Sequence, residues 1–93
     1  MKIGVYIFPT KYSISVVDLA RALEDRGFES LFVPEHTHIP VSRRTPFPGG
    51  EPLPREYANC LDPFVVLSAA AAATRTLRVG TGICLVSQRD PIV

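Results

Sequence analysis

Hydrophobic residues form two short runs near the start of the chain. Residues 2–8, KIGVYIF, are mostly β-branched or aromatic and show no regular alternation with polar residues. Residues 30–34, SLFVP, form a second run that ends at a proline. Runs of this length and composition are typical of strands that are buried on both faces, as in a parallel sheet. We therefore predict strands over residues 2–8 and 30–34.

The segment between these runs has the pattern of an amphipathic helix. Charged residues fall on one side of it, and the apolar residues that recur at intervals of three and four fall on the other: Val16, Leu19, Ala20 and Leu23. Ser15, with Asp18 three residues later, matches a variant of the capping box. Gly27 is placed for a left-handed C-cap. These signals predict a helix over residues 16–26.

Prolines and glycines are dense in residues 39–58, which excludes a regular helix or strand. Loops of about 20 residues inside compact domains are usually functional or disordered. Asp62 and Pro63 then supply an N-cap and a first-turn proline for a helix over residues 62–74, whose body is free of charge. Residues 77–86, LRVGTGICLV, predict a third strand with two internal glycines.

The order strand, helix, strand, long loop, helix, strand corresponds to two βαβ units with parallel strands. Doubly wound sheets and (β/α)8 barrels both begin in this way. A complete barrel needs about 250 residues, so a chain of 93 residues supplies about three of its eight strands. We therefore expect an α/β fold in one domain spanning residues 1–93, the amino-terminal portion of a larger parallel structure.

Composition and net charge limit the kinds of molecule that the chain is expected to bind. The chain is 46% hydrophobic and 20% charged, which is globular, and its net charge of +1 argues against nucleic acid or an anionic membrane surface. The first apolar run is too short for a signal peptide or a membrane span. Cys60 and Cys84 do not form a disulfide framework. We expect a cytoplasmic protein.

A cluster of polar side chains follows the second predicted strand in the stretch FVPEHTHIP. Glu35 and His36 lie at the carboxyl end of this strand, where parallel α/β folds bind their ligands. Two interpretations are open: His36 is an acid–base group, or it is a structural histidine bonded to a neighbouring carbonyl. His36 and His38, one residue apart and without a third ligand, fall short of zinc spacing, so we expect no metal.

The stretch VGTG, residues 79–82, has part of a dinucleotide-binding fingerprint. The complete fingerprint would need a glycine at position 85, which is Leu85, so a Rossmann phosphate loop is not predicted. Glycines near the end of a strand mark a bulge, or they let a flat ring approach the backbone. We expect Cys84 to be a buried, inert residue of the strand.

Four segments together resemble the luciferase-like monooxygenase superfamily: GVYIF, RGFESLFVPEHTHIP, LDPFVVLSAAAAATRTLRVGTGICLV and QRDPIV. The chain is most similar to the oxidoreductases of this superfamily that use the deazaflavin coenzyme F420. The resemblance extends over the whole chain. It implies the amino-terminal βαβαβ portion of a (β/α)8 TIM barrel, with the flavin or deazaflavin ring in the mouth at the carboxyl ends of the strands.

The resemblance also implies an activity, which is hydride transfer at C5 of a deazaflavin or, with FMN, oxygen activation. It places His36 against the ring and a small organic substrate, as a catalytic and cofactor-binding residue. Glu35 beside it is a second catalytic residue or a residue that orients His36, and Thr37 is a polar contact of the cofactor. Gly82 and Ile83 match a bulge that backs the ring, often with a non-prolyl cis peptide bond. Residues that bind the cofactor phosphate belong to later strands, outside this chain.

Three functions remain open at this stage. The first is an oxidoreductase or monooxygenase that uses reduced coenzyme F420, and the second is an FMN-dependent monooxygenase. The third is a non-catalytic fragment that only self-assembles, since the 93-residue piece by itself is expected to be inactive. Three parallel strands leave two sheet edges unpaired, and unpaired edges favour association with another chain. We therefore expect a homodimer or a higher homo-oligomer.

Overall fold

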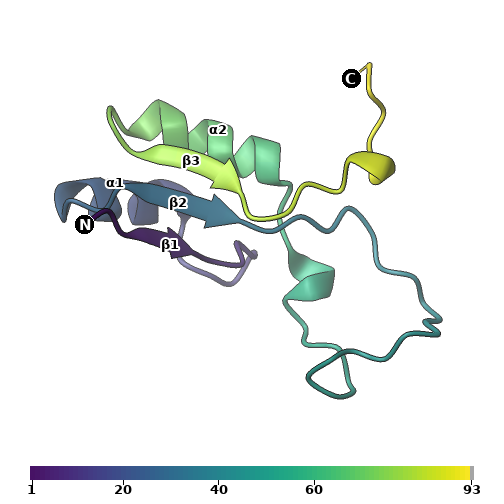
Figure 1. Ribbon diagram of the computed structural model, residues 1–93. Coiled ribbons are helices and arrows are strands. Elements are labelled where there is room, and N and C mark those ends of the chain that lie inside the picture. The colour runs from purple at the N-terminus through teal and green to yellow at the C-terminus, as the bar shows by residue number, and fades with distance from the viewer. Residues whose placement is uncertain (93) are drawn as a thin grey trace.

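The computed structural model describes residues 1–92 as one parallel sheet with two helices (Figure 1). The sheet has the order β1-β2-β3, formed by β1 (Gly4–Tyr6), β2 (Ser30–Val33) and β3 (Arg78–Thr81). The helices and short 3-10 turns are α1 (Val16–Asp25), η1 (Tyr57–Asn59), α2 (Pro63–Ala73) and η2 (Val86–Gln88). The predicted α/β class, the element order and the parallel pairing are confirmed.

The sheet ends earlier than the sequence pattern predicts. Tyr6 pairs with Phe32 in the last register of β1, and Val33 pairs with Thr81 in the last register of β3. Pro34 follows and has no N–H to donate, so the ladder stops there. The prediction of one strand from residue 77 to residue 86 is therefore wrong beyond Thr81, and Gly82 lies after the strand.

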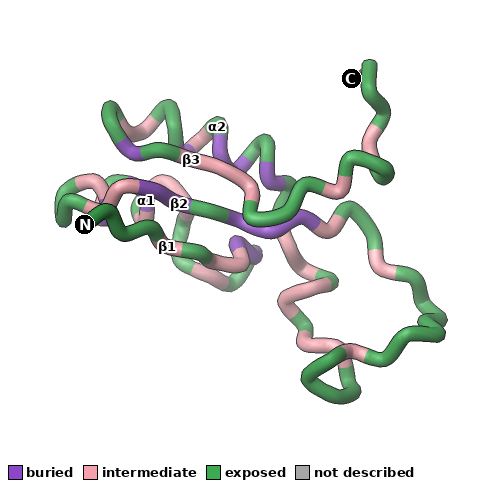
Figure 2. Tube along the Cα trace, in the orientation of Figure 1, coloured by how far each residue is buried: buried purple, intermediate pink, exposed green. Residues whose placement is uncertain are grey.

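One face of the sheet is buried and the other is open. Leu31 and Val33 are 0% exposed, whereas Phe32 between them is 39% exposed. Both helices pack on the face of Leu31 and Val33, in a core that comprises Ala20, Leu23, Leu31, Ala70 and Leu77, and beside it Val33, Val66 and Leu67. Buried segments accordingly follow β2 and the inner side of α2 (Figure 2). The prediction that the strands are buried on both faces is wrong for the described chain, because both helices cover the same face.

Two of the three predicted helix caps are confirmed. Asp62 accepts hydrogen bonds from the N–H groups of Phe64 (2.9 Å) and Val65 (3.1 Å) at the start of α2. Gly27 has the left-handed φ of 77° expected of a C-cap glycine. Ser15 is the N-cap of α1, but its side chain makes no capping hydrogen bond, so the capping box is wrong.

Glu24 fastens α1 to the turn that enters β3. Its carboxylate accepts hydrogen bonds from the N–H groups of Arg75 (2.9 Å), Thr76 (2.6 Å) and Leu77 (3.0 Å). The bond from the Thr76 amide is the main cause that lowers the pKa of Glu24 to about 2, and partial burial opposes it. This contact stabilises the amino-terminal end of the sheet, opposite the end that carries Glu35 and His36.

The stability of the fold should decrease in acid because of Glu24. Its pKa is 4.5 without these bonds and about 2 with them, so its contribution is present above pH 4.5 and is lost as the pH falls toward about 2. We expect Glu24→Gln to be less stable at pH 7 and to lose less stability between pH 7 and pH 3, as measured by urea unfolding. Asp18→Asn, an exposed position of α1, is the control. An acid dependence of Glu24→Gln equal to that of the wild type would contradict this role.

Candidate functional site

The long loop leaves the carboxyl end of β2 and returns beside the end of β1. Residues 34–56 contain no helix or strand and extend away from the sheet (Figure 1). At the return, Thr10 and Cys60 form an isolated antiparallel bridge, and the Leu61 N–H donates to the Pro9 carbonyl at 2.8 Å. These contacts fix the position of η1, which carries Tyr57, next to the strand ends.

A pocket of about 360 Å³ lies where the three strands end. Residues that follow or end the strands line it together with one residue of η1: Tyr6, Phe8, Pro34, Glu35, His36, Tyr57, Ile83 and Leu85. Its volume falls within the range of about 300–1,000 Å³ that is usual for small-molecule sites. Its walls are mainly apolar. Glu35 and His36, the two residues that the sequence predicted at the end of the second strand, are part of the lining.

His36 forms an aromatic cluster with Phe8 and Tyr57, in which each ring lies near the other two. The ring of Phe8 is nearly parallel to the imidazole, at a centroid distance of 6.2 Å and an interplanar angle of 14°. The ring of Tyr57 lies 4.9 Å from the imidazole and 5.0 Å from Phe8. Flat aromatic walls of this kind suit a planar ligand, because offset stacking is favourable at these separations.

His36 is partly buried and is neutral at pH 7. Burial lowers its pKa below the ordinary value of 6.5, and the negative charge of Glu35 opposes this effect. A neutral imidazole has one N–H donor and one acceptor nitrogen. Within residues 1–92 the His36 ring makes no side-chain hydrogen bond, so it is not bonded to a neighbouring carbonyl. Its donor and acceptor are free for a ligand in the pocket.

Glu35 is 1% exposed, and both of its carboxylate oxygens are occupied. Oε2 accepts a hydrogen bond from the N–H of Leu85, and Oε1 accepts one from Nε of Arg89. Burial raises the pKa of Glu35, but the bonds from Leu85 and Arg89 outweigh burial, and the pKa is lowered. Glu35 is therefore an ionised, fixed carboxylate beside His36.

Thr37 and His38 lie outside the pocket wall. The Thr37 hydroxyl donates to Oε1 of Gln88 at 2.7 Å, and it lies 3.0 Å from Nδ1 of His38. Both side chains are exposed, and neither lines the pocket. The structure thus brings Glu35 and His36 to the same site and directs Thr37 to Gln88.

The glycines of the third strand region support aromatic rings of the protein itself. A Cβ atom on Gly80 would lie 2.9 Å from Cε1 of Phe32, and one on Gly82 would lie 2.5 Å from Cε2 of Tyr6. A side chain at either position would therefore require the neighbouring ring to shift, and glycine lets both rings lie against this backbone. The close approach of a flat ring to this backbone is therefore made by Phe32 and Tyr6.

The residues after Gly82 differ in part from expectation. Ile83, which the resemblance places behind the cofactor ring, lines the pocket. The peptide bond between Gly82 and Ile83 is trans, since among residues 1–92 the cis bond is that of Glu51–Pro52. Cys84 is exposed, so its predicted burial is wrong. The physical reason is that β3 ends at Thr81, which leaves Cys84 outside the sheet.

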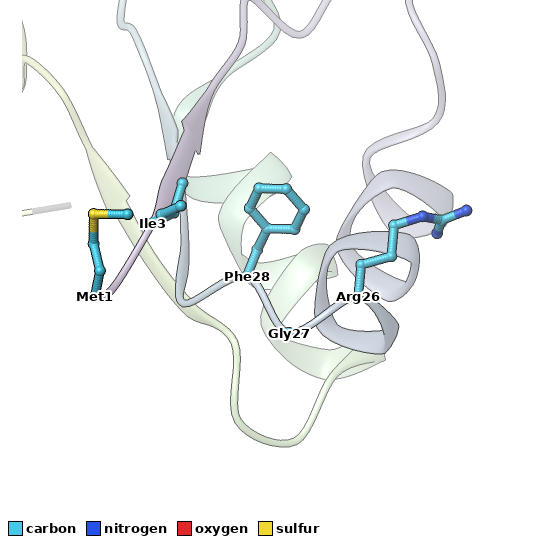
Figure 3. Close-up of a pocket in the computed structure, with 5 residues that line it drawn as sticks. All are labelled: Met1, Ile3, Arg26, Gly27 and Phe28. Atoms are coloured by element: carbon cyan, nitrogen blue, oxygen red, sulfur yellow. The ribbon is translucent and has the colours of Figure 1, made fainter.

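A second, smaller hollow of about 140 Å³ lies at the opposite end of β1 (Figure 3). Met1, Ile3, Gly27 and Phe28 form most of its wall. Its polar side chain is that of Arg26, which extends away from Met1 and Phe28 in Figure 3 and donates to the Ala22 carbonyl at 3.0 Å. This hollow is the smaller of the two and lies away from the carboxyl ends of the strands, where parallel α/β folds bind their ligands, so the pocket at the carboxyl ends is the candidate site.

Residues 1–92 hold no group of three or more His, Cys, Asp or Glu side chains that could bind a metal ion. Among the helices of these residues, none is long and apolar enough to cross a membrane.

Sequence reasoning missed several residues of this site. Phe8 lies in a predicted strand and Tyr57 in a predicted loop, and the sequence pattern marks neither as a site residue. The available signal for Tyr57 was an aromatic residue at the end of a proline-rich loop that follows a polar strand end. Arg89 had no signal, because its partners Glu35 and Asp62 lie 54 and 27 residues away in the sequence.

Comparison with known proteins identifies the family of this chain. The chain matches the family model of the luciferase-like monooxygenases over residues 1–93, and it belongs to this family. The uncharacterized proteins Rv0953c of Mycobacterium tuberculosis and Mb0978c of Mycobacterium bovis are each 41% identical to it over 95 residues. The match covers 99% of this chain and 34% of each relative, so the chain spans about a third of the length of these curated relatives. No solved structure gives a significant match.

Proposed function

We propose that the intact protein is an oxidoreductase that acts on a small organic substrate with reduced coenzyme F420, by hydride transfer or monooxygenation. The observation that carries this proposal is His36, a neutral imidazole that makes no side-chain hydrogen bond within residues 1–92 and lies next to the rings of Phe8 and Tyr57. It lies in a pocket at the carboxyl ends of parallel strands, the usual position of active sites in such folds. Membership of the luciferase-like monooxygenase family supports the oxidoreductase class.

The residues of the pocket fit a planar, largely apolar cofactor ring. Phe8, Tyr57 and Ile83 would contact its faces and edges, and His36 supplies the titratable group next to it. The cofactor, when bound, supplies the hydride chemistry. The protein orients the substrate and excludes water, and the imidazole donates or accepts a proton at a substrate oxygen.

We also propose that the intact protein completes a (β/α)8 barrel around this pocket. The outer edges of β1 and β3 have no strand partner within residues 1–92. The open face of the sheet exposes 52% of Tyr6 and 39% of Phe32, an arrangement that the interior of a closed barrel would cover. The matched relatives are about three times as long as this chain, which is sufficient for such a barrel.

An FMN-dependent monooxygenase is the second candidate. The apolar walls formed by Phe8, Tyr57 and Ile83 suit the ring of FMN as well as that of a deazaflavin, since both are planar tricyclic systems. The similarity of the stretch PEHTHIP to deazaflavin-dependent members favours coenzyme F420. A non-catalytic, self-assembling chain is the alternative of a different class, and it predicts binding of neither cofactor.

Cofactor titration tests these candidates. We expect the intact protein to bind reduced coenzyme F420 more tightly than FMN, as measured by fluorescence quenching. Tyr57→Ala should weaken binding of the preferred cofactor about tenfold, the effect of losing roughly 1.4 kcal/mol of aromatic contact. Tyr12→Ala is the control, because Tyr12 contacts Arg55 and is not part of the pocket. Tighter binding of FMN would reject the F420 assignment, and binding of neither cofactor would reject the enzyme.

A further inference from the structure

The segment that follows β3 forms one wall of the pocket. This wall segment, residues 82–89, contributes Ile83 and Leu85 to the lining. It begins with the Gly82 N–H donating to the Val33 carbonyl at 2.9 Å, and after that bond it has left the sheet. Backbone hydrogen bonds of η2 shape the end of this segment, and after Gly82 the hydrogen bonds that join it to the rest of the described chain involve side chains.

Glu35 supplies the first of these contacts. It lies at the end of β2, is 1% exposed, and accepts the N–H of Leu85 on one carboxylate oxygen. Its other oxygen accepts the Nε–H of Arg89 at the end of the wall segment. A buried carboxylate without partners is strongly unfavourable, so the folded chain keeps Leu85 and Arg89 where they satisfy it.

Arg89 also binds Asp62 at the start of α2. Its Nη2 donates to Oδ2 of Asp62 at 2.7 Å, and its guanidinium lies 4.5 Å from the centroid of the Phe64 ring. The other oxygen of Asp62 caps α2. One guanidinium thus joins the end of β2, the first turn of α2 and the end of the wall segment.

This geometry does not suit Glu35 for proton exchange with a substrate. Both of its oxygens already accept hydrogen bonds, and the guanidinium of Arg89 favours the ionised form. A group that gives up or takes up a proton in each turnover would have to break these bonds every time. A fixed carboxylate can instead hold the backbone of Leu85 in one place.

We propose that Glu35 and Arg89 are positioning residues, which hold the wall segment in the shape that forms the pocket. Only the expected effect on cofactor binding rests on the proposed function. The geometry itself, in which the buried Glu35 carboxylate holds the backbone of Leu85 and the side chain of Arg89, is independent of which cofactor the pocket takes. The link acts through the wall, and neither residue transfers a proton to the substrate.

Hydrogen–deuterium exchange of the intact protein without cofactor tests the link directly. In Arg89→Met, the backbone amides of residues 82–89 should exchange at least tenfold faster, while α2 and β3 keep their protection. Arg89→Lys should restore part of the protection, because an ammonium keeps the charge but lacks the planar fork that reaches two carboxylates. Arg78→Met, which removes an exposed pair with Glu29 (3.5 Å), is the matched control and should leave the segment unchanged.

The double variant Glu35→Gln/Arg89→Met covers the case in which the single variant fails to fold, since it leaves no buried charge unpaired. It should fold and show the same rapid exchange in residues 82–89. Unchanged exchange in this segment, or faster exchange spread evenly over the chain, would overturn the proposal.

Cofactor titration of the same variants separates this proposal from the proposed function. Folded Arg89→Met should bind the preferred cofactor at least tenfold more weakly, with partial recovery in Arg89→Lys. Affinity equal to that of the wild type in a variant with a loosened wall would also overturn the positioning role. If the wild type binds neither FMN nor coenzyme F420, the proposed function fails, and the exchange result still decides whether the link holds the wall.

Discussion

Replacing His36 by alanine in the intact protein should reduce turnover about 100-fold or more and leave the fold almost unchanged. A positioned acid–base group typically contributes about 10²–10⁴-fold to the rate. His36 is placed for this role, because its ring faces the pocket and makes no side-chain hydrogen bond within residues 1–92. The stability of the fold should change little, since the ring packs against Phe8 and Tyr57 and lies outside both core clusters.

The experiment compares His36→Ala with His38→Ala. His38 is exposed, contacts Thr37 and lies outside the pocket, so its loss should leave turnover at the wild-type level. Turnover is followed by the absorbance of the cofactor, and stability by the melting temperature. Unchanged turnover of His36→Ala together with a lowered melting temperature would show that His36 is a structural residue.

The pH dependence of turnover gives a second measure of the same group. Burial lowers the pKa of His36 below 6.5, so the imidazole remains neutral to a more acidic pH than a free histidine. If the neutral form is the active one, turnover should persist below pH 6.5 and decline only as His36 becomes protonated. A decline centred above pH 6.5 would contradict this assignment of the active form.

Leu31→Ala should produce the largest loss of stability among single substitutions in β2. Leu31 is 0% exposed and contacts residues of both helices in the core, so alanine would leave a cavity that the neighbours cannot fill. Substitutions of this kind cost about 2–5 kcal/mol of unfolding free energy. This is a large part of the roughly 5–15 kcal/mol that stabilises an ordinary domain.

Urea unfolding of the intact protein measures this loss, with Val65→Ala as the control. Val65 is 70% exposed on α2 and should change the unfolding free energy by no more than about 0.5 kcal/mol. Equal losses in the two variants would mean that the helices do not cover the Leu31 face. Because Glu35 and His36 follow β2 directly after Pro34, a loosened Leu31 core should also weaken cofactor binding at the end of this strand.

Much of this architecture could be predicted from the sequence, because it depends on local interactions. The cap formed by Asp62 and the left-handed turn at Gly27 involve residues within one helical turn of each other. The order of the elements follows from the same kind of pattern. The position of Glu35 and His36 at a ligand-binding edge also followed, since in a parallel sheet the carboxyl ends of the strands meet on one side.

The extent and the burial of the strands could not be predicted in this way. Phe32 and Leu31 are both hydrophobic, and the sequence does not say which face the helices cover. The end of β3 at Thr81 is set by Pro34 on the neighbouring strand, which is not visible from the glycines at positions 80 and 82. The tertiary structure thus decided that Gly80 and Gly82 make room for Phe32 and Tyr6.

The sequence by itself determined the α/β class, the order of the elements and the edge of the sheet that carries His36. Only the tertiary structure decided which distant side chains meet at that edge. Tyr57 reaches His36 because the bridge between Thr10 and Cys60 brings the long loop back to β1. Arg89 reaches Glu35 across 54 residues of sequence for a similar reason, since both strand ends project to the same side of the sheet. Contacts of this kind join residues that are far apart in the sequence. A local pattern of residues does not show which distant segments lie next to each other in the fold.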